Sequence, residues 1–188
     1  MGTTLPTISL SHLDELWFQV SGTLCNLTCN HCFISCSPTN NNFGFLSLAA
    51  VHASLQQSVT LGVKGYYFTG GEPFLNPEMT AILIATLKYG PATVLTNATV
   101  RKQDWIDALV AASRASRYSL EFRVSIDGFD AATNDPIRGA GTFARARAGV
   151  QQLVKAGFLP IITATRTWPQ GNDRTVLANF IKTLKEAG

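Results

Sequence analysis

Leu120-Glu121-Phe122-Arg123-Val124-Ser125-Ile126-Asp127 is the stretch that decides the fold. Its apolar and polar side chains alternate strictly, as expected for a β-strand with one buried and one polar face. A parallel sheet covered by helices on both sides has two apolar faces. A polar face therefore favours a barrel whose lumen carries a ligand, and an edge strand with one solvent-exposed face is the alternative.

The segments on both sides of this strand repeat the order of strand and helix. Further runs of apolar, β-branched or aromatic residues predict strands at 16–20, 66–69, 93–96 and 160–165, and the quoted strand covers 120–126. Each intervening helix must return the chain to the same end of the sheet, so we expect parallel strands with right-handed crossovers. The sequence predicts an α/β fold with outer helices, and its polar strand face favours the barrel.

Five amphipathic helices are expected between and after these strands. The first two have clear ends, with Ser47 as a cap and Gly62 at the end of one, and Asn76 as a cap and Gly90 at the end of the other. The remaining helices are expected at residues 101–112, after Thr142, and after Asn172 as far as Gly188.

Length and composition indicate one globular domain over residues 1–188. The chain is 46% hydrophobic and 14% charged, which is enough to bury one substantial core. Its net charge of +3 is modest, although residues 101–188 carry thirteen basic and eight acidic groups, and it gives no clear signal for nucleic acid. No apolar run approaches the ~20 residues that cross a membrane. We expect a cytoplasmic protein without a membrane segment.

All four cysteines lie between Cys25 and Cys36, in a loop of about 25 residues without helical or strand periodicity. Loops of this length in compact domains are usually functional or disordered. Distant disulfide partners are absent from the sequence, so a metal site or redox chemistry is favoured. In α/β barrels, loops that leave the carboxyl ends of strands build the active site.

The spacing CxxxCxxC of Cys25, Cys29 and Cys32 can supply three thiolates to a 4Fe-4S cluster. One iron would then stay open for substrate, as one position stays open in a catalytic zinc site. Cys36 leaves an alternative open, because a fourth thiolate would complete a closed electron-transfer or zinc site. Cys29 and Cys32 alone form a CxxC redox pair, an interpretation that the additional Cys25 disfavours.

Gly70-Gly71-Glu72-Pro73 follows the cysteines by about 40 residues. Together with CxxxCxxC, this segment makes the sequence resemble the radical SAM superfamily over almost its whole length. The resemblance is strongest to the peptide-modifying and molybdopterin-pathway branches. The resemblance implies a partial TIM barrel that holds a 4Fe-4S cluster and S-adenosylmethionine. It implies an enzyme in which reductive cleavage of S-adenosylmethionine gives a 5'-deoxyadenosyl radical that abstracts hydrogen from a substrate. An external donor of the flavodoxin or ferredoxin type would supply the electron, and the substrate is an unidentified peptide or small molecule.

Several residues are expected at the cofactor by this resemblance. His31 occupies a position that the family usually fills with an aromatic residue near the adenine, or it is a plain polar loop residue. The segment from Gly70 to Pro73 is expected to hold the amino group of the cofactor, with Glu72 as an acceptor. Glycines there permit close backbone approach, and the proline fixes the turn.

The carboxyl ends of later strands supply further candidates. Ser125 and Asp127 match a Ser-Ile-Asp-Gly segment that lies beside the ribose and methionine in similar enzymes, although Asp127 is equally suited to cap a turn. Arg138 is expected to pair with the cofactor carboxylate, or to be a surface arginine. Weaker candidates for the rim of the cofactor site are Asn97, Thr163 and Thr165.

The chain departs from the family in its number of strand-helix units. The usual core has six, and five are counted, with the chain ending where the sixth strand would begin. We expect a core truncated at its C-terminal end or an unusually open barrel, and hence low stability or pairing with another chain. A domain that binds the cofactor without turning it over is a further interpretation.

Overall fold

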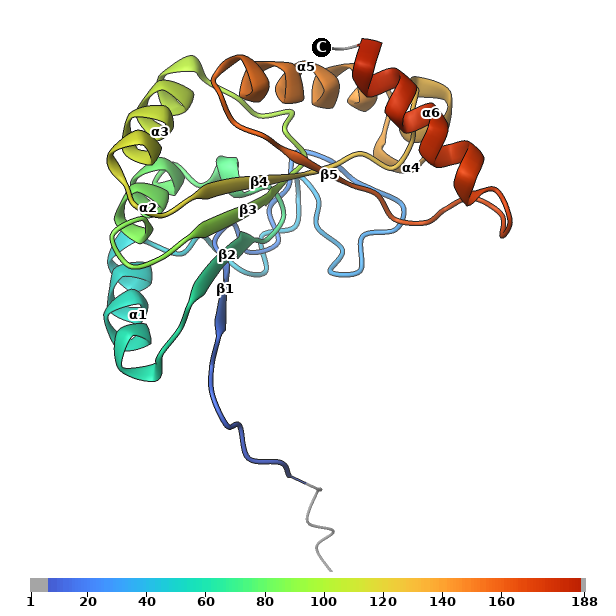
Figure 1. Ribbon diagram of the computed structural model, residues 1–188. Helices are drawn as coiled ribbons and strands as arrows, with labels where there is room; N and C mark the ends of the chain where they lie inside the picture. The colour runs from blue at the N-terminus through green and yellow to red at the C-terminus, as the bar shows by residue number, and fades with distance from the viewer. Residues whose placement is uncertain (1–6, 187–188) are drawn as a thin grey trace, which may run out of the picture.

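The computed structural model describes residues 7–186 as one parallel five-stranded sheet with helices (Figure 1). The strands lie in the order of the chain, β1-β2-β3-β4-β5, and each pairs in parallel with the next. The sheet is curved and not closed. All carboxyl ends of the strands therefore lie at one edge, where the loops that follow them meet.

The five predicted strands are confirmed, each within two residues at either end. Their bounds are Glu15–Gln19 (β1), Gly65–Thr69 (β2), Ala92–Thr96 (β3), Leu120–Ser125 (β4) and Ile161–Thr163 (β5). The alternation expected for β4 is present, because Leu120, Phe122 and Val124 are buried while Glu121, Arg123 and Ser125 are only half-buried. One face of the sheet packs on helices, and the other is open, with the polar side chains of β4 beside the stacked rings of Trp17 and Tyr67.

Helices cover the outer side of the curved sheet. They are Leu48–Leu61 (α1), Met79–Thr86 (α2), Gln103–Ala115 (α3), Ala131–Arg138 (α4), Thr142–Lys155 (α5) and Asp173–Glu186 (α6). In Figure 1, α1, α2, α3 and α5 follow the outside of the curve, and the loop of residues 20–46 lies on the inner side. The core between sheet and helices contains Phe68, Val94 and Phe122, all buried.

The helix predictions need several corrections. The α2 helix begins at Met79 with Glu78 as its cap residue, because the Asn76 side chain is used elsewhere: it donates to the Val20 and Leu46 carbonyls and accepts from the Glu78 amide. A short 3₁₀ turn, Pro73–Leu75 (η1), precedes it. The α4 helix was not predicted, because it has few apolar residues and contains Pro136.

The ends predicted for the first helix agree with the structure, whereas the second helix ends at Thr86 and not at Gly90, and the third spans Gln103–Ala115 and not 101–112. Ser47 caps α1 by accepting from the Ala50 amide, and Gly62 ends the helix in the left-handed region. The last helix is described as far as Glu186, so the predicted end at Gly188 lies outside the described residues. In the described part of the chain, no helix has the length and apolar character needed to span a lipid bilayer.

Candidate functional site

A cleft of about 330 Å³ opens at the carboxyl ends of the strands, and all four cysteines line it. The rest of its wall comes from the loop of residues 20–46, from the ends of β2, β3 and β4, and from α4. These lining residues include His31, Gly70, Gly71, Asn97, Ser125, Arg138 and Thr165. The structure thus brings together motifs that are more than 100 residues apart in the sequence.

Gly70 and Gly71 allow the end of β2 to pack directly on the cysteine loop. A Cβ atom at Gly71 would lie 2.0 Å from the Leu24 carbonyl oxygen, and Gly70 has a φ of 131°, which disfavours any side chain. The amides of Gly71 and Glu72 donate to the carbonyls of Gly22 and Leu24, at 3.0 and 3.1 Å. The glycine pair therefore fixes where Cys25 stands relative to the sheet.

The residues between the cysteines fasten the loop to its surroundings. Asn26 donates to the Thr99 hydroxyl at 2.8 Å, and it accepts from Asn97 at 2.9 Å. The side chain and amide of Asn30 donate to the last carbonyls of α4, those of Pro136 at 2.8 Å and Ile137 at 2.9 Å. Carbonyls in the last turn of a helix have no partner within the helix, so they are free to accept these bonds.

Asp127 joins the cysteine loop to the end of the sheet. Its buried carboxylate accepts from Arg138 Nε at 2.6 Å and from His31 Nε2 at 2.8 Å, both at Oδ2. Its other oxygen accepts from the Thr165 amide at 2.7 Å. Asn134 accepts from the Asp127 amide, which fixes the backbone as well. The carboxylate bonds to groups remote in sequence, so it does not serve as the local turn cap considered for Asp127.

The Asp127 carboxylate positions Arg138 and His31, and each of them keeps a donor or acceptor atom that is free to bind another group. The Arg138 side chain is only 11% exposed, so the surface alternative for this residue is wrong. Its bond to Asp127 uses Nε, which leaves the terminal amino groups of the guanidinium for another acceptor. The Nδ1 atom of His31 is buried and has no hydrogen-bond partner within the described structure. Buried polar atoms are usually paired, so this atom is suited to form a hydrogen bond with a molecule bound in the cleft.

Glu72 lies behind the cleft wall, and its side chain is fully buried. One oxygen accepts from the Thr96 hydroxyl at 2.7 Å and the Phe74 amide at 3.1 Å, and the other accepts from the Asn97 amide at 2.8 Å. Burial raises the pKa of Glu72 to about 7, against the lowering effect of these donors. The carboxylate thus links the Gly-Gly-Glu-Pro turn to the end of β3. Neither it nor Pro73 lines the cleft.

The weaker candidates are placed unequally. Asn97 lines the cleft, and its amide nitrogen lies 3.8 Å from Cys25 Sγ. Ser125 also lines it and is 3.5 Å from the Thr163 hydroxyl. Thr163 itself is not part of the wall, whereas Thr165 is. Sequence patterns missed Asn26 and Asn30, which could have been found as the polar residues that separate the motif cysteines.

The environment of the thiols fits a metal cluster. Burial raises the pKa of Cys25 to about 11 and also raises that of Cys29, so these thiols need a cation to become thiolates at neutral pH. Backbone amides point at two of the sulfurs: that of Leu27 lies 3.4 Å from Cys25 Sγ and that of Cys36 lies 3.2 Å from Cys32 Sγ. Such donors stabilise thiolate ligands and tune a cluster.

Cys36 lies in the same cleft as a free, buried thiol. Burial raises its pKa to about 12, and its own amide serves Cys32. Among residues 7–186, no three side chains of His, Cys, Asp or Glu converge as ligands of a single metal ion. The four thiols thus do not form a preassembled mononuclear site.

Comparison with known proteins gives a family match and two kinds of relative. The family model of the Radical SAM superfamily matches residues 20–178. The mycofactocin maturase MftC of Mycobacterium ulcerans is 33% identical over 135 residues, 71% of this chain and 35% of the relative. The GTP 3',8-cyclase of Psychromonas ingrahamii is 31% identical over 141 residues, 72% of this chain and 39% of the relative. The chain spans little more than a third of the length of these relatives.

Solved structures share the fold. SuiB of Streptococcus suis bound to S-adenosylmethionine matches with a TM-score of 0.75 at 20% identity, over 94% of this chain and 38% of SuiB. SuiB bound to its precursor peptide SuiA gives a TM-score of 0.76 at 23% identity, over 93% of this chain and 38% of SuiB. The likeness confirms the predicted partial barrel.

Proposed function

This chain belongs to the radical SAM superfamily, and from that premise we propose that it is an enzyme that cleaves S-adenosylmethionine reductively. A 4Fe-4S cluster in the cleft would supply the electron, and the resulting 5'-deoxyadenosyl radical would take hydrogen from a substrate. The observation that carries the proposal is the cleft itself, in which three motif cysteines, the glycine turn, His31 and Arg138 face one space.

Cys25, Cys29 and Cys32 are proposed as the cluster ligands, which leaves one iron open for the cofactor. The buried amides at two of these sulfurs support this assignment. Cys36 is proposed as a supporting residue whose amide serves Cys32. The alternative of a non-catalytic electron carrier or zinc protein with Cys36 as fourth ligand is not favoured, because the family match and the curated relatives are those of radical SAM proteins.

Arg138 is proposed to bind the carboxylate of S-adenosylmethionine. Its terminal guanidinium nitrogens are unused by Asp127, and a guanidinium binds carboxylates through parallel hydrogen bonds. The backbone carbonyls of Gly70 and Gly71 are proposed as acceptors for the amino group of the same molecule. Glu72 would support this binding from behind the cleft wall. Its buried carboxylate fixes the position of the turn and favours a positively charged group nearby.

His31, Asn97, Ser125 and Thr163 are proposed around the nucleoside part of the cofactor. The Asp127 carboxylate holds the Nε2 proton of His31, so Nδ1 is left as an acceptor for an amino group such as that of adenine. Ser125 presents its hydroxyl at the end of β4. Thr163 would act through Ser125, and Asp127 is proposed as the residue that positions His31 and Arg138.

Residues 1–188 are proposed as the core domain of this enzyme. An external one-electron donor of the flavodoxin or ferredoxin type is proposed as its reductant. The relatives include a mycofactocin maturase and a GTP 3',8-cyclase, and the proposed substrate is a peptide or a small molecule. The peptide is supported by the structural likeness to SuiB, which has been solved with a precursor peptide.

Anaerobic reconstitution with iron, sulfide and dithionite tests the proposal. We expect about four irons per chain, a change in the electron paramagnetic resonance of the reduced cluster when S-adenosylmethionine is added, and formation of 5'-deoxyadenosine. Arg138→Lys is the matched variant, because it keeps the charge and loses the forked geometry, and it should weaken cofactor binding about tenfold or more. Bound zinc, or a reduced cluster that never cleaves S-adenosylmethionine, would overturn the proposal.

A further inference from the structure

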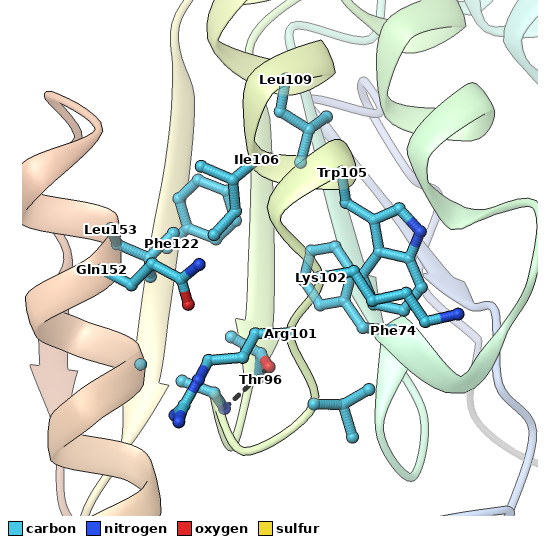
Figure 2. A pocket seen from close by; sticks show the side chains of 13 residues that line it. Phe74, Thr96, Arg101, Lys102, Trp105, Ile106, Leu109, Phe122, Gln152 and Leu153 are labelled. Atoms are coloured by element: carbon cyan, nitrogen blue, oxygen red, sulfur yellow. Dashed lines mark hydrogen bonds between the residues drawn. The ribbon is translucent and has the colours of Figure 1, made fainter.

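Three exposed cations meet where β3 leads into α3 and where α5 begins. They are Arg101, Lys102 and Arg145. Figure 2 shows the first two at the mouth of a small apolar pocket, with the Lys102 side chain lying along the ring of Trp105. The Lys102 ammonium is 4.8 Å from the centre of that ring. This cation–π contact keeps the ammonium at the mouth of the pocket. We call these three cations the basic patch.

Contacts between α3 and α5 make the basic patch one surface. Arg101 Nη1 donates to the Arg145 carbonyl at 2.7 Å, which draws the loop after β3 onto the first turn of α5. Spacings of four and three residues bring Arg145, Gly149 and Gln152 to the same face of α5. Gly149 packs on Ala98, and Gln152 donates to Gln103 at 2.9 Å. Arg101 and Arg145 are therefore neighbours, and the Arg145 side chain itself donates from Nε to the Gly141 carbonyl at 3.4 Å.

The side chains of the basic patch form no ion pair in the described part of the chain. The nearest acidic residues on α3 are Asp104 and Asp107, and the latter accepts from Gln103. The Asp135 carboxylate accepts from the Gly141 and Phe143 amides at the amino end of α5, at 2.7 and 2.9 Å, and Asp104 lies in the first turn of α3. The patch thus attracts anionic surfaces through its three side-chain cations and not through the helix dipoles.

A short chain of hydrogen bonds connects the basic patch with the sulfur of Cys25. Asn97 Nδ2 lies 3.8 Å from Cys25 Sγ and donates to Asn26 at 2.9 Å. Asn26 in turn donates to the Thr99 hydroxyl at 2.8 Å, and Thr99 precedes Arg101 by two residues. The segment that carries Arg101 and Lys102 is thus joined to the cysteine loop through Thr99 and Asn26.

We propose that the basic patch is the docking site of an acidic one-electron carrier protein, which reduces the cluster through the Cys25 side of the loop. This inference rests on the proposed function and adds to it the face at which the electron enters. The carrier is oxidised by one electron and the cluster is reduced by one, with no bond made or broken. Charge complementarity between such partners mainly raises the rate of association and depends on salt.

The test uses the reconstituted full chain, with recombinant flavodoxin as the acidic probe and cytochrome c as a basic one. In Lys102→Glu/Arg145→Glu, two charges are reversed at helix amino ends, where acidic residues are favourable, so the fold should be kept. The matched control is Lys88→Glu/Arg117→Glu, which reverses two exposed charges that precede β3 and β4 at the opposite edge of the sheet. Titration calorimetry measures flavodoxin binding, and 5'-deoxyadenosine formation is followed with flavodoxin or with dithionite.

We expect the patch variant to bind flavodoxin roughly tenfold more weakly at low salt, with the difference shrinking at 0.5 M salt. Its rate with flavodoxin should fall likewise while its rate with dithionite stays unchanged, and the control should match the wild type in every measurement. Equal loss in the control, unaltered flavodoxin binding in the patch variant, or equally tight binding of cytochrome c or RNA would overturn the inference. Absence of 5'-deoxyadenosine with dithionite in the wild type would instead reject the proposed function.

Discussion

Replacing Asp127 with Asn tests whether one buried carboxylate holds the two sides of the cleft together. The change removes the charge that faces Arg138 and His31, which approach Oδ2 at 2.6 and 2.8 Å. An amide that keeps its oxygen on the Thr165 amide would place its NH₂ group against these two donors. Removing one partner of a buried ion pair costs about 3–5 kcal/mol. We expect a loss of that size in the free energy of unfolding.

Urea unfolding of the reconstituted protein under anaerobic conditions gives this free energy. Asp173→Asn is the matched control, because Asp173 also pairs with an arginine, Arg166, but both side chains are about half exposed, at 60% and 48%. An exposed pair contributes less than about 1 kcal/mol. The Asp127 variant should also bind S-adenosylmethionine more weakly, since Arg138 loses its support. A loss in Asp127→Asn no larger than that in the control would refute the reasoning.

Three further changes probe separate parts of the structure. Burial raises the pKa of Glu72 from 4.5 to about 7, so the folded chain binds this proton more tightly than the unfolded chain. Stability should therefore fall by on the order of 3 kcal/mol as the pH rises from about 4.5 to about 7, and the same pH slope in Glu72→Gln would contradict this. Cys36→Ala should keep the iron and sulfide content of the wild type, because Cys36 is not one of the three proposed ligands. Loss of the metal in this variant would support Cys36 as a fourth ligand. Gly71→Ala should lower the free energy of unfolding by about 1–3 kcal/mol, because the added Cβ meets the Leu24 carbonyl. Gly44→Ala is the control and should have no such effect, because nothing lies within 4 Å of a Cβ there. Equal midpoints of urea unfolding in the two variants would argue against this packing.

The strands could be predicted because their signals are local. The β4 segment shows its two faces in the order of its residues, and its buried face is the one expected. Ser47 and Gly62 act within one turn of α1, so their types alone indicate the ends of that helix. The three motif cysteines are recognised by their spacing in the sequence, and all three line the cleft.

Other features depend on contacts that sequence patterns do not contain. Asp127 and Arg138 are separated by a helix that has Pro136 in it and little apolar periodicity, so neither α4 nor their ion pair could be anticipated. Glu72 was expected to face the cofactor, and its buried position follows from donors on β3 that lie more than 20 residues downstream. Asn76 resembles a helix cap in sequence, but two remote carbonyls compete for its side chain.

Each strand pairs with the one made just before it, so the sheet can assemble in the order in which a ribosome releases the chain. The cysteine loop is synthesised early and fastened late, because its partners Thr99, Asp127 and Ile137 lie 73 or more residues downstream of the residues they bind. A nascent chain that stops short of α4 still lacks the carbonyls that bind Asn30, so the part of the loop around Cys29 and Cys32 is not yet held. Iron and sulfide delivered during translation would therefore reach a cluster site that is not yet complete, whereas after release of the chain they would reach the folded site.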